Sequence, residues 1–318
     1  MGQQAWGWLI AVYLFLGGLG AGSFLIAAFF ELRGWRYQKD FCPVALVGST
    51  VSGPLVALGS LLLIFDLGAG KMEPWRIFYM FTHPSSVMTW GIWILTAFIP
   101  LAFAYGFLEL MEVMPFLKRL ISKWVPSLIT KTRTYRRWVA AVGSVFAVAT
   151  AVYTGVLLSI VGPAVPLWSQ NVLPFLGLPM LPILFLVSAV STGLGLAFDV
   201  TAPIGDPEIQ TRHRIMDLSH ILLIGLEGIL IGLLLVAALN HGGPAADAAR
   251  MIVSGPLSAV FWVGVVLVGL VYPFVVHAYA IGRGQHSILS GVSSGLGIVI
   301  AGLLLRYMIV VAGIPAAL

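Results

Sequence analysis

The chain has 318 residues, of which 59% are hydrophobic and only 9% are charged. Soluble domains carry about 25% charged residues, so this composition excludes a soluble globular protein and indicates a polytopic membrane protein. The net charge of +5 does not indicate nucleic-acid binding, because the basic residues lie in short segments between apolar runs. The single cysteine, Cys42, excludes a disulfide framework, a cysteine-ligated cluster and a zinc site. Any redox centre therefore belongs to a partner or is a bound organic molecule.

Eight apolar runs follow one another along the chain, each long enough to cross a bilayer as a helix. The first is too long for a signal peptide and no small-residue cleavage site follows it, so we expect a retained helix. The runs are Trp6–Phe30, Cys42–Phe65, Ser85–Leu108, Trp138–Val161, Met180–Phe198, Leu218–Leu239, Gly255–Ala280 and Ile288–Ile314.

The segments between these runs alternate in positive charge. Thirteen of the 17 lysines and arginines follow the first, third, fifth and seventh runs, and seven of them lie between Lys118 and Arg137. Cytoplasmic loops are enriched in lysine and arginine, so we predict that both termini are on the outer, periplasmic side. The predicted fold is an all-α integral membrane protein with eight transmembrane helices. We expect two four-helix bundles, residues 1–162 and 163–318, in the cell inner membrane.

Two outer segments have distinctive compositions. Lys71–Thr82 is rich in aromatic residues, which suits a segment lying flat at the membrane interface. Pro163–Pro179 contains four prolines and no charged residue, which predicts an irregular cap over the helices.

Several polar and aromatic residues are predicted to share one layer of the membrane. Tyr153 lies about eight residues, or roughly 12 Å, inside the outer boundary of its run, and Tyr13 and Arg306 lie at a similar depth. Trp90 and Trp93 come one to two turns into the third run. Isolated aromatics in membrane helices are usually interface or packing residues. Their convergence on one layer favours instead a pocket for a flat ligand with carbonyl groups, such as a quinone.

Ionisable residues inside hydrocarbon are costly and therefore indicate a partner, water or function. Asp217, His220 and Glu227 are three and seven residues apart, so they share one helical face. This face is either a polar seam between helices or a proton-conducting chain, which His277 could join.

Three further ionisable or histidine arrangements leave alternatives open. Asp66 and Asp199 end their runs and suit either ordinary boundary residues or functional acids. Arg306 is either a structural partner of Asp66 or Glu227, or a hydrogen-bond donor to an oxygen of a ligand ring. Haem needs axial ligands at matching depths, and His220 and His277 are the histidines that meet this condition. A haem near the inner side is therefore the weaker alternative to a proton-conducting role for these two residues.

Four motifs, in this order, resemble a known family. They are Trp6-Gly-Trp8 with Tyr13-Leu-Phe-Leu-Gly-Gly-Leu-Gly-Ala-Gly22; His83-Pro-Ser-Ser-Val-Met-Thr-Trp-Gly91-Ile-Trp93; Tyr153-Thr-Gly-Val-Leu-Leu158 with Pro166-Leu-Trp168; and Leu305-Arg-Tyr307 with Ala312-Gly313. Together they resemble the membrane subunits of the polysulfide reductase family, called NrfD-like or PsrC-like, over all eight predicted helices.

The resemblance implies a haem-free anchor, without an iron–sulfur cluster of its own, that exchanges electrons between menaquinone or ubiquinone and a four-cluster-type iron–sulfur subunit on the outer face. A molybdopterin catalytic subunit is the implied further partner, and membrane lipids surround the chain. By motif, Tyr153 is the phenol beside the quinone, His83 and Ser86 lie at the start of the third helix, and Asp66 matches an acid at the end of the second helix. Some members have asparagine and histidine on the first helix where this chain has Ile10 and Tyr13.

The sequence therefore predicts a quinone-reactive subunit with the quinone in the first bundle, bound by Tyr153, Tyr13, Trp90, Trp93, Arg306, His83 and Ser86. The predicted proton path is Asp66, Asp217, His220 and Glu227. An ion-coupled secondary transporter is the main alternative, and it predicts broken helices at mid-membrane and a clear internal repeat. A purely structural anchor without a quinone site is the other.

Overall fold

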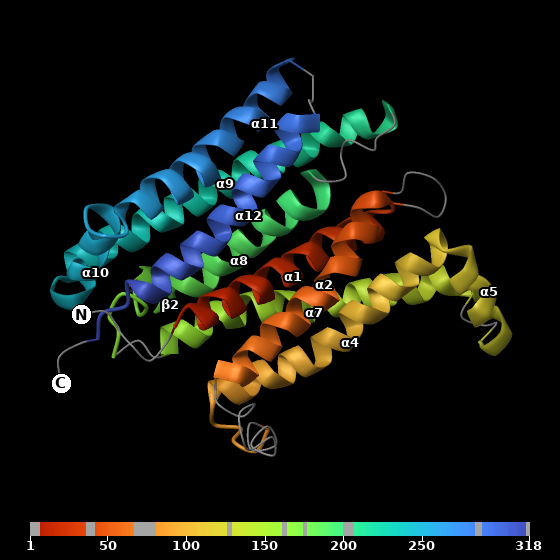
Figure 1. Ribbon diagram of the computed structural model, residues 1–318, viewed down its shortest axis with the longest axis horizontal. Coiled ribbons are helices and arrows are strands. Elements are labelled where there is room, and N and C mark those ends of the chain that lie inside the picture. The colour runs from red at the N-terminus through yellow and green to blue at the C-terminus, as the bar shows by residue number, and fades with distance from the viewer. Residues whose placement is uncertain are drawn as a thin grey trace.

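The structure is a computed structural model of the chain (Figure 1) and describes residues 7–35, 42–66, 81–125, 129–160, 164–173, 177–199, 207–283 and 288–315. Within these ranges, eight helical spans are long and apolar enough to cross a membrane, as the sequence predicted. The long helices are α1 Trp8–Arg33, α2 Pro43–Asp66, α4 Val87–Val113, α7 Thr132–Ile160, α8 Met180–Leu194, α9 Pro207–His241, α11 Tyr272–Arg283 and α12 Ile288–Val311.

Two of these spans contain π-helix, which the apolar pattern does not reveal. η2, Gly195–Asp199, extends α8, and η4, Val260–Val271, precedes α11 in the same span. Two shorter helices, α5 Pro115–Trp124 and α10 Gly243–Val253, follow α4 and α9. π-Helical turns are rare and often mark functional sites, which draws attention to Asp199 at the end of η2.

The spans run up and down with alternating ends (Figure 1). At one end of the molecule lie the last residues of α1, α4, η2 and α11 and the first residues of α2, α7, α9 and α12. Helix α5 lies at the same end. α10 and the short strands lie at the opposite end, where α1 begins and α12 ends. The prediction that this second end is periplasmic stays a prediction.

α1 and α8 are the central helices. α1 packs against α2, α7, α8 and α12, and α8 also packs against α7, α9 and α12. Their crossing is close because Gly22 of α1 meets the backbone of Ala189, and Gly193 of α8 meets the backbone of Gly22, so a Cβ at either glycine would overlap main chain. The division into two four-helix bundles stays a prediction, since α1 and α8 join the two halves.

The cap between α7 and α8 is more regular than the prolines suggested. β1, Asn171–Leu173, pairs antiparallel with β2, Leu178–Pro179, so the predicted irregular cap is wrong for these residues. Trp168, 1% exposed, donates its indole N–H to the Ile309 carbonyl at 2.8 Å. The ring also packs on Gly313 and thereby joins the cap to the end of α12.

Candidate functional site

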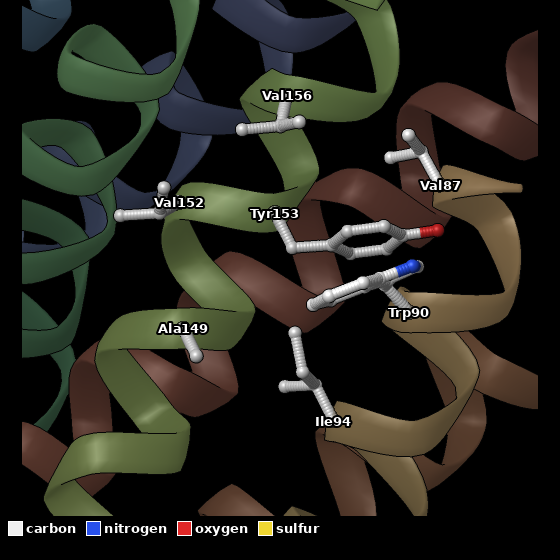
Figure 2. Close-up of a pocket in the computed structure, with 7 residues that line it drawn as sticks. All are labelled: Val87, Trp90, Ile94, Ala149, Val152, Tyr153 and Val156. Carbon is white, nitrogen blue, oxygen red and sulfur yellow. The ribbon is translucent and has the colours of Figure 1, made fainter. Parts of the chain in front are cut away.

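A cavity of about 350 Å³ lies between α4 and α7, within the size range of small-molecule sites (Figure 2). Seven residues line it, and most of its wall is aliphatic. The lining residues are Val87, Trp90 and Ile94 of α4 and Ala149, Val152, Tyr153 and Val156 of α7. They belong to the first two turns of α4 and the last three of α7, so the cavity lies toward the end of the bundle where α1 begins.

Tyr153 is the buried polar group of this cavity. Its side chain reaches from α7 toward α4, where the ring and hydroxyl contact Gly91 (Figure 2). A Cβ at position 91 would overlap the phenol, so glycine is required for this placement. The Tyr153 side chain is 4% exposed, and its hydroxyl has no hydrogen-bond partner among the described residues. An unpaired buried hydroxyl is costly, which favours a ligand that accepts its proton.

Tyr13 of α1 lies beside Tyr153, as their common depth predicted. The two phenols are close enough to interact electrostatically. Tyr13 is 1% exposed, and within the described part of the chain its hydroxyl also lacks a partner with hydrogen-bond geometry. The two phenols are therefore adjacent, but only Tyr153 lines the cavity and Tyr13 lies behind it on α1.

The two predicted tryptophans differ in their relation to the cavity. The Trp90 ring lies alongside the Tyr153 ring (Figure 2), while its N–H donates to the Pro84 carbonyl at 2.7 Å. Trp90 therefore offers a ring face and no free donor. Trp93 does not line the cavity; its ring centroid is 6.3 Å from that of Trp90.

His83 and Ser86 belong to the turn that precedes α4. His83 is exposed, and its Nδ1 lies 3.0 Å from the Thr82 hydroxyl. Ser86 is the N-cap residue of α4, and its backbone N–H donates to the His83 carbonyl at 2.9 Å. Neither residue is in the cavity wall. His83 and Ser86 therefore lie at the beginning of α4, at least one helical turn before Trp90.

Arg306 lies across α1 from the cavity. Its guanidinium packs against Gly18, whereas the neighbouring Gly17 faces Thr154 of α7. Arg306 is fully buried and donates to the Ser188 hydroxyl at 3.1 Å and the Gly302 carbonyl at 2.9 Å. It also lies over the Phe185 ring, 5.1 Å from the centroid. This environment belongs to α8 and α12, so Arg306 does not line the cavity.

Glu227 of α9 is the acid that interacts with Arg306. Glu227 is 6% exposed and lies within reach of Ser188 and Ser191. Its charge also acts on Arg306. Ser188 is therefore shared between the guanidinium and the carboxyl group. Of the two roles considered for Arg306, this environment favours the structural one, in which Arg306 and Glu227 interact electrostatically and share Ser188.

A second cluster of titratable groups lies near the opposite end of the molecule. His277 of α11 has its Nδ1 2.8 Å from Asp217 Oδ1 and its Nε2 3.1 Å from the Ser294 hydroxyl. The Asp199 carboxylate lies beside both histidines, with Oδ1 3.2 Å from His220 Nε2 and Oδ2 3.8 Å from His277 Nε2. All five side chains are almost fully buried.

This cluster combines predicted and unexpected residues. Asp217 and His220 share one face of α9 as predicted, but each meets its partner on another helix. Asp199, which also suited a boundary residue, is central because η2 turns it inward against Gly295 of α12. Ser294 carried no signal in the sequence, since serine is common in membrane helices.

The geometry of the two histidines favours proton chemistry over metal binding. Their rings are stacked, with centroids 4.1 Å apart and planes 7° apart. A nitrogen lone pair lies in its ring plane, so the lone pairs of parallel stacked rings run side by side and do not converge on one ion. Although ligand atoms of Asp199, His220 and His277 lie within 4.8 Å of one another, the arrangement suits proton exchange between imidazole and carboxylate.

A third cluster of buried charged side chains was not predicted from the sequence. Arg136 of α7 has its Nε 3.3 Å from Glu31 Oε2 of α1 and 3.5 Å from Glu109 Oε1 of α4. The three side chains are 1–2% exposed. Arg136 suited a solvated loop charge beside Arg137, but α7 begins four residues earlier, at Thr132, and turns Arg136 inward. Asp66, predicted on the proton path, ends α2, and its side chain lies outside the described residues.

Comparison with known proteins decides the family. The family model described as "Polysulphide reductase, NrfD" matches residues 1–316. The chain belongs to the NrfD family. The resemblance read from the four motifs is thereby confirmed.

Two relatives share the full length of this NrfD-family protein. The C chain of polysulfide reductase from Wolinella succinogenes is 32% identical, with 97% of the present sequence and 94% of the relative aligned. Protein NrfD of Escherichia coli strain K12 is 28% identical over the same shares of both sequences. With eight membrane-length helices among the described residues, this NrfD-family protein is a multi-pass inner-membrane protein in a family of respiratory electron-transfer subunits.

Proposed function

We propose that this protein exchanges electrons between a membrane quinone and an iron–sulfur subunit, and that the quinone ring binds in the cavity between α4 and α7. The observation that carries the proposal is the buried Tyr153 hydroxyl, which lies beside the Tyr13 phenol without a partner in hydrogen-bond geometry among the described residues, at a cavity of about 350 Å³ with otherwise apolar walls. A quinone supplies two-electron, two-proton chemistry, so the protein has to orient the ring and exchange protons. Menaquinone and ubiquinone both carry carbonyl groups that accept a phenol hydrogen bond.

Each residue of the cavity has a task in this proposal. Tyr153 donates to a ring carbonyl, and Tyr13, which does not line the cavity, lies next to Tyr153 and orients its hydroxyl. The Trp90 ring face stacks on a flat ligand, because its N–H is already bonded to Pro84. The aliphatic side chains Val87, Ile94 and Val156 exclude water and match an isoprenoid tail. Arg306 acts through its electrostatic interaction with Glu227 and not by contact with the ring.

The partner subunit is proposed at the end of the molecule where α1 begins. The cavity is built from the first turns of α4 and the last turns of α7, so the ring is closer to this end than to the other. The distribution of lysine and arginine predicts that this end is periplasmic. A relative named as the C chain of polysulfide reductase supports a complex with other polypeptides, for which an iron–sulfur subunit and a molybdopterin subunit are proposed.

Tyr153→Phe tests the quinone site. Losing one hydrogen bond to the ring should cost about 0.5–1.5 kcal/mol, which is up to roughly a tenfold rise in the quinone KM of the purified complex. Tyr105→Phe is the matched control, because Tyr105 is another buried tyrosine whose hydroxyl donates to the Ala27 carbonyl, at 3.1 Å, away from the cavity.

Both variants should still bind the partner subunits. Unchanged quinone kinetics in Tyr153→Phe would refute this position for the site and favour the purely structural anchor. Equal losses in both variants would assign the effect to stability.

We further propose that the second cluster of titratable groups, together with Glu227, carries protons during turnover. The supporting observation is the buried arrangement of Asp217, His277, Asp199 and His220 across α9, α11 and η2. His220 and Glu227 are seven residues apart on α9, about 10 Å along its axis, so a proton crossing this interval needs water.

Glu227→Gln tests the proton route, because an amide does not titrate. Proteoliposomes with the variant complex should transfer electrons but take up fewer protons per electron from the inner side. Asp247→Asn is the control, since Asp247 is 62% exposed on α10 at the other end. Proton uptake equal to that of the wild type would return Glu227 to a packing role.

A further inference from the structure

Helix α5 is amphipathic in a way that the quinone and proton proposals do not use. It follows α4 after the single residue Met114. At 100° per residue, its apolar side chains fill one arc of about 140°, and its polar side chains fill the other. The apolar residues are Phe116, Leu117, Leu120, Ile121 and Trp124, and the polar residues are Lys118, Arg119, Ser122 and Lys123.

Most of the apolar arc of α5 is exposed in the part of the chain that the structure describes, and Leu117 and Ile121 are half-buried. Phe116 is 73%, Leu120 is 49% and Trp124 is 82% exposed, and none of the ten residues of α5 is buried. The main neighbour of α5 is the helix before it, α4. Lys118 pairs with Glu112 of α4 at 3.1 Å, which holds the beginning of α5 beside the end of α4. Such large exposed apolar side chains on one side of a helix mark a surface that something covers.

The position of α5 identifies what covers it. α4 has 27 residues and ends at Val113, so the next helix begins where a membrane-crossing helix leaves the hydrocarbon. Figure 1 shows α5 turned away from the direction of α4 at the end of the molecule where α7 begins. A helix at this level, with tryptophan and phenylalanine on one arc and basic residues on the other, suits the boundary between acyl chains and lipid headgroups.

We propose that α5 lies in the plane of the membrane, with Phe116, Leu120 and Trp124 in the acyl region and Lys118, Arg119 and Lys123 against anionic phospholipid headgroups. α5 contains no acidic residue, so all of its charged side chains are attracted to anionic headgroups. A basic cluster directly after a membrane span attracts anionic lipids, and the predicted orientation assigns this surface to the inner leaflet. The proposal is independent of the quinone site.

Spin labels measure the depth of the two arcs. Leu120→Cys and Ser122→Cys, each in a Cys42→Ser background, place a label on the apolar or the polar arc of the complete complex in nanodiscs with phosphatidylglycerol. The label at position 120 should collide with oxygen several-fold more often, relative to a water-soluble nickel chelate, than the label at position 122. In the triple variant Lys118→Gln, Arg119→Gln, Lys123→Gln, or in nanodiscs of phosphatidylcholine alone, this difference should shrink at least twofold.

Three outcomes overturn the proposal. Equal exposure of both labels to the nickel chelate means that α5 stands off the membrane. Protection of position 120 from both reagents means that a protein subunit covers the apolar arc. An unchanged difference in the triple variant and in neutral lipid means that headgroup charge has no part in the binding. Arg250→Gln, which removes a 69% exposed charge from α10, is the control and should change neither label.

Discussion

Replacing Arg136 by methionine tests whether the three-residue charge group holds the first helices together. In the folded protein its Nε lies 3.3 Å from Glu31 and 3.5 Å from Glu109, and none of the three side chains is more than 2% exposed. The group joins α1, α4 and α7, which are distant in sequence. Methionine fills a similar volume but leaves two carboxyl groups without this cation.

The expected cost follows from burial. Removing one partner of a buried ion pair typically costs about 3–5 kcal/mol, because the remaining buried charge loses its counter-charge. Arg137 is the adjacent arginine on the same helix and is exposed. An exposed substitution usually changes stability by about 0.5 kcal/mol or less, so Arg137→Met should have almost no effect.

The assay is the free energy of unfolding of the purified protein, obtained by denaturant titration in mixed micelles. Adding Glu31→Gln and Glu109→Gln to Arg136→Met removes the two carboxylate charges that faced Arg136 and should recover much of the loss. Equal stability of the Arg136→Met and Arg137→Met proteins would refute the reasoning, because it would mean that the buried pairing contributes nothing beyond an exposed charge.

Two other substitutions test contacts around the cavity and the cap. Gly91→Ala should push the Tyr153 phenol aside and raise the quinone KM. Gly225→Ala should leave the KM unchanged, because a Cβ at position 225 meets nothing within 4 Å. Equal KM values for the two variants would contradict the placement of Tyr153 at the quinone. Trp168→Phe removes the buried 2.8 Å bond to Ile309 and should cost about 1–3 kcal/mol of stability. Trp262→Phe removes an exposed 3.0 Å bond to Val253 and should cost less, and the reverse order would contradict the role given to the cap.

The spans were predictable from the sequence because the bilayer imposes a local rule. A helix needs about 20 apolar residues to cross the hydrocarbon, and this can be counted along the chain without knowledge of any neighbour. The alternating loop charge, the common depth of Tyr13 and Tyr153 and the shared face of Asp217 and His220 follow from the same local geometry. The family resemblance also rested on short local motifs, and the match over residues 1–316 confirms it.

The partner of each polar side chain was decided only by the tertiary structure. Helices such as α1 and α8 are apolar around their whole circumference, so the pattern does not reveal which side faces protein. Tyr153 and Arg306 have similar depths, yet α1 separates them, and only Tyr153 lines the cavity.

Long-range packing likewise decided the other buried charges. Asp199 points inward because η2 changes the helical phase at the end of α8 and Gly295 leaves room for it. Arg136 and Arg137 are the same residue type at adjacent positions, but one faces Glu31 and Glu109 and the other is exposed. The sequence determines how often and how deep the chain crosses the membrane, because those are properties of single helices. Contacts between helices determine which residues form a site, because they join positions far apart in the chain.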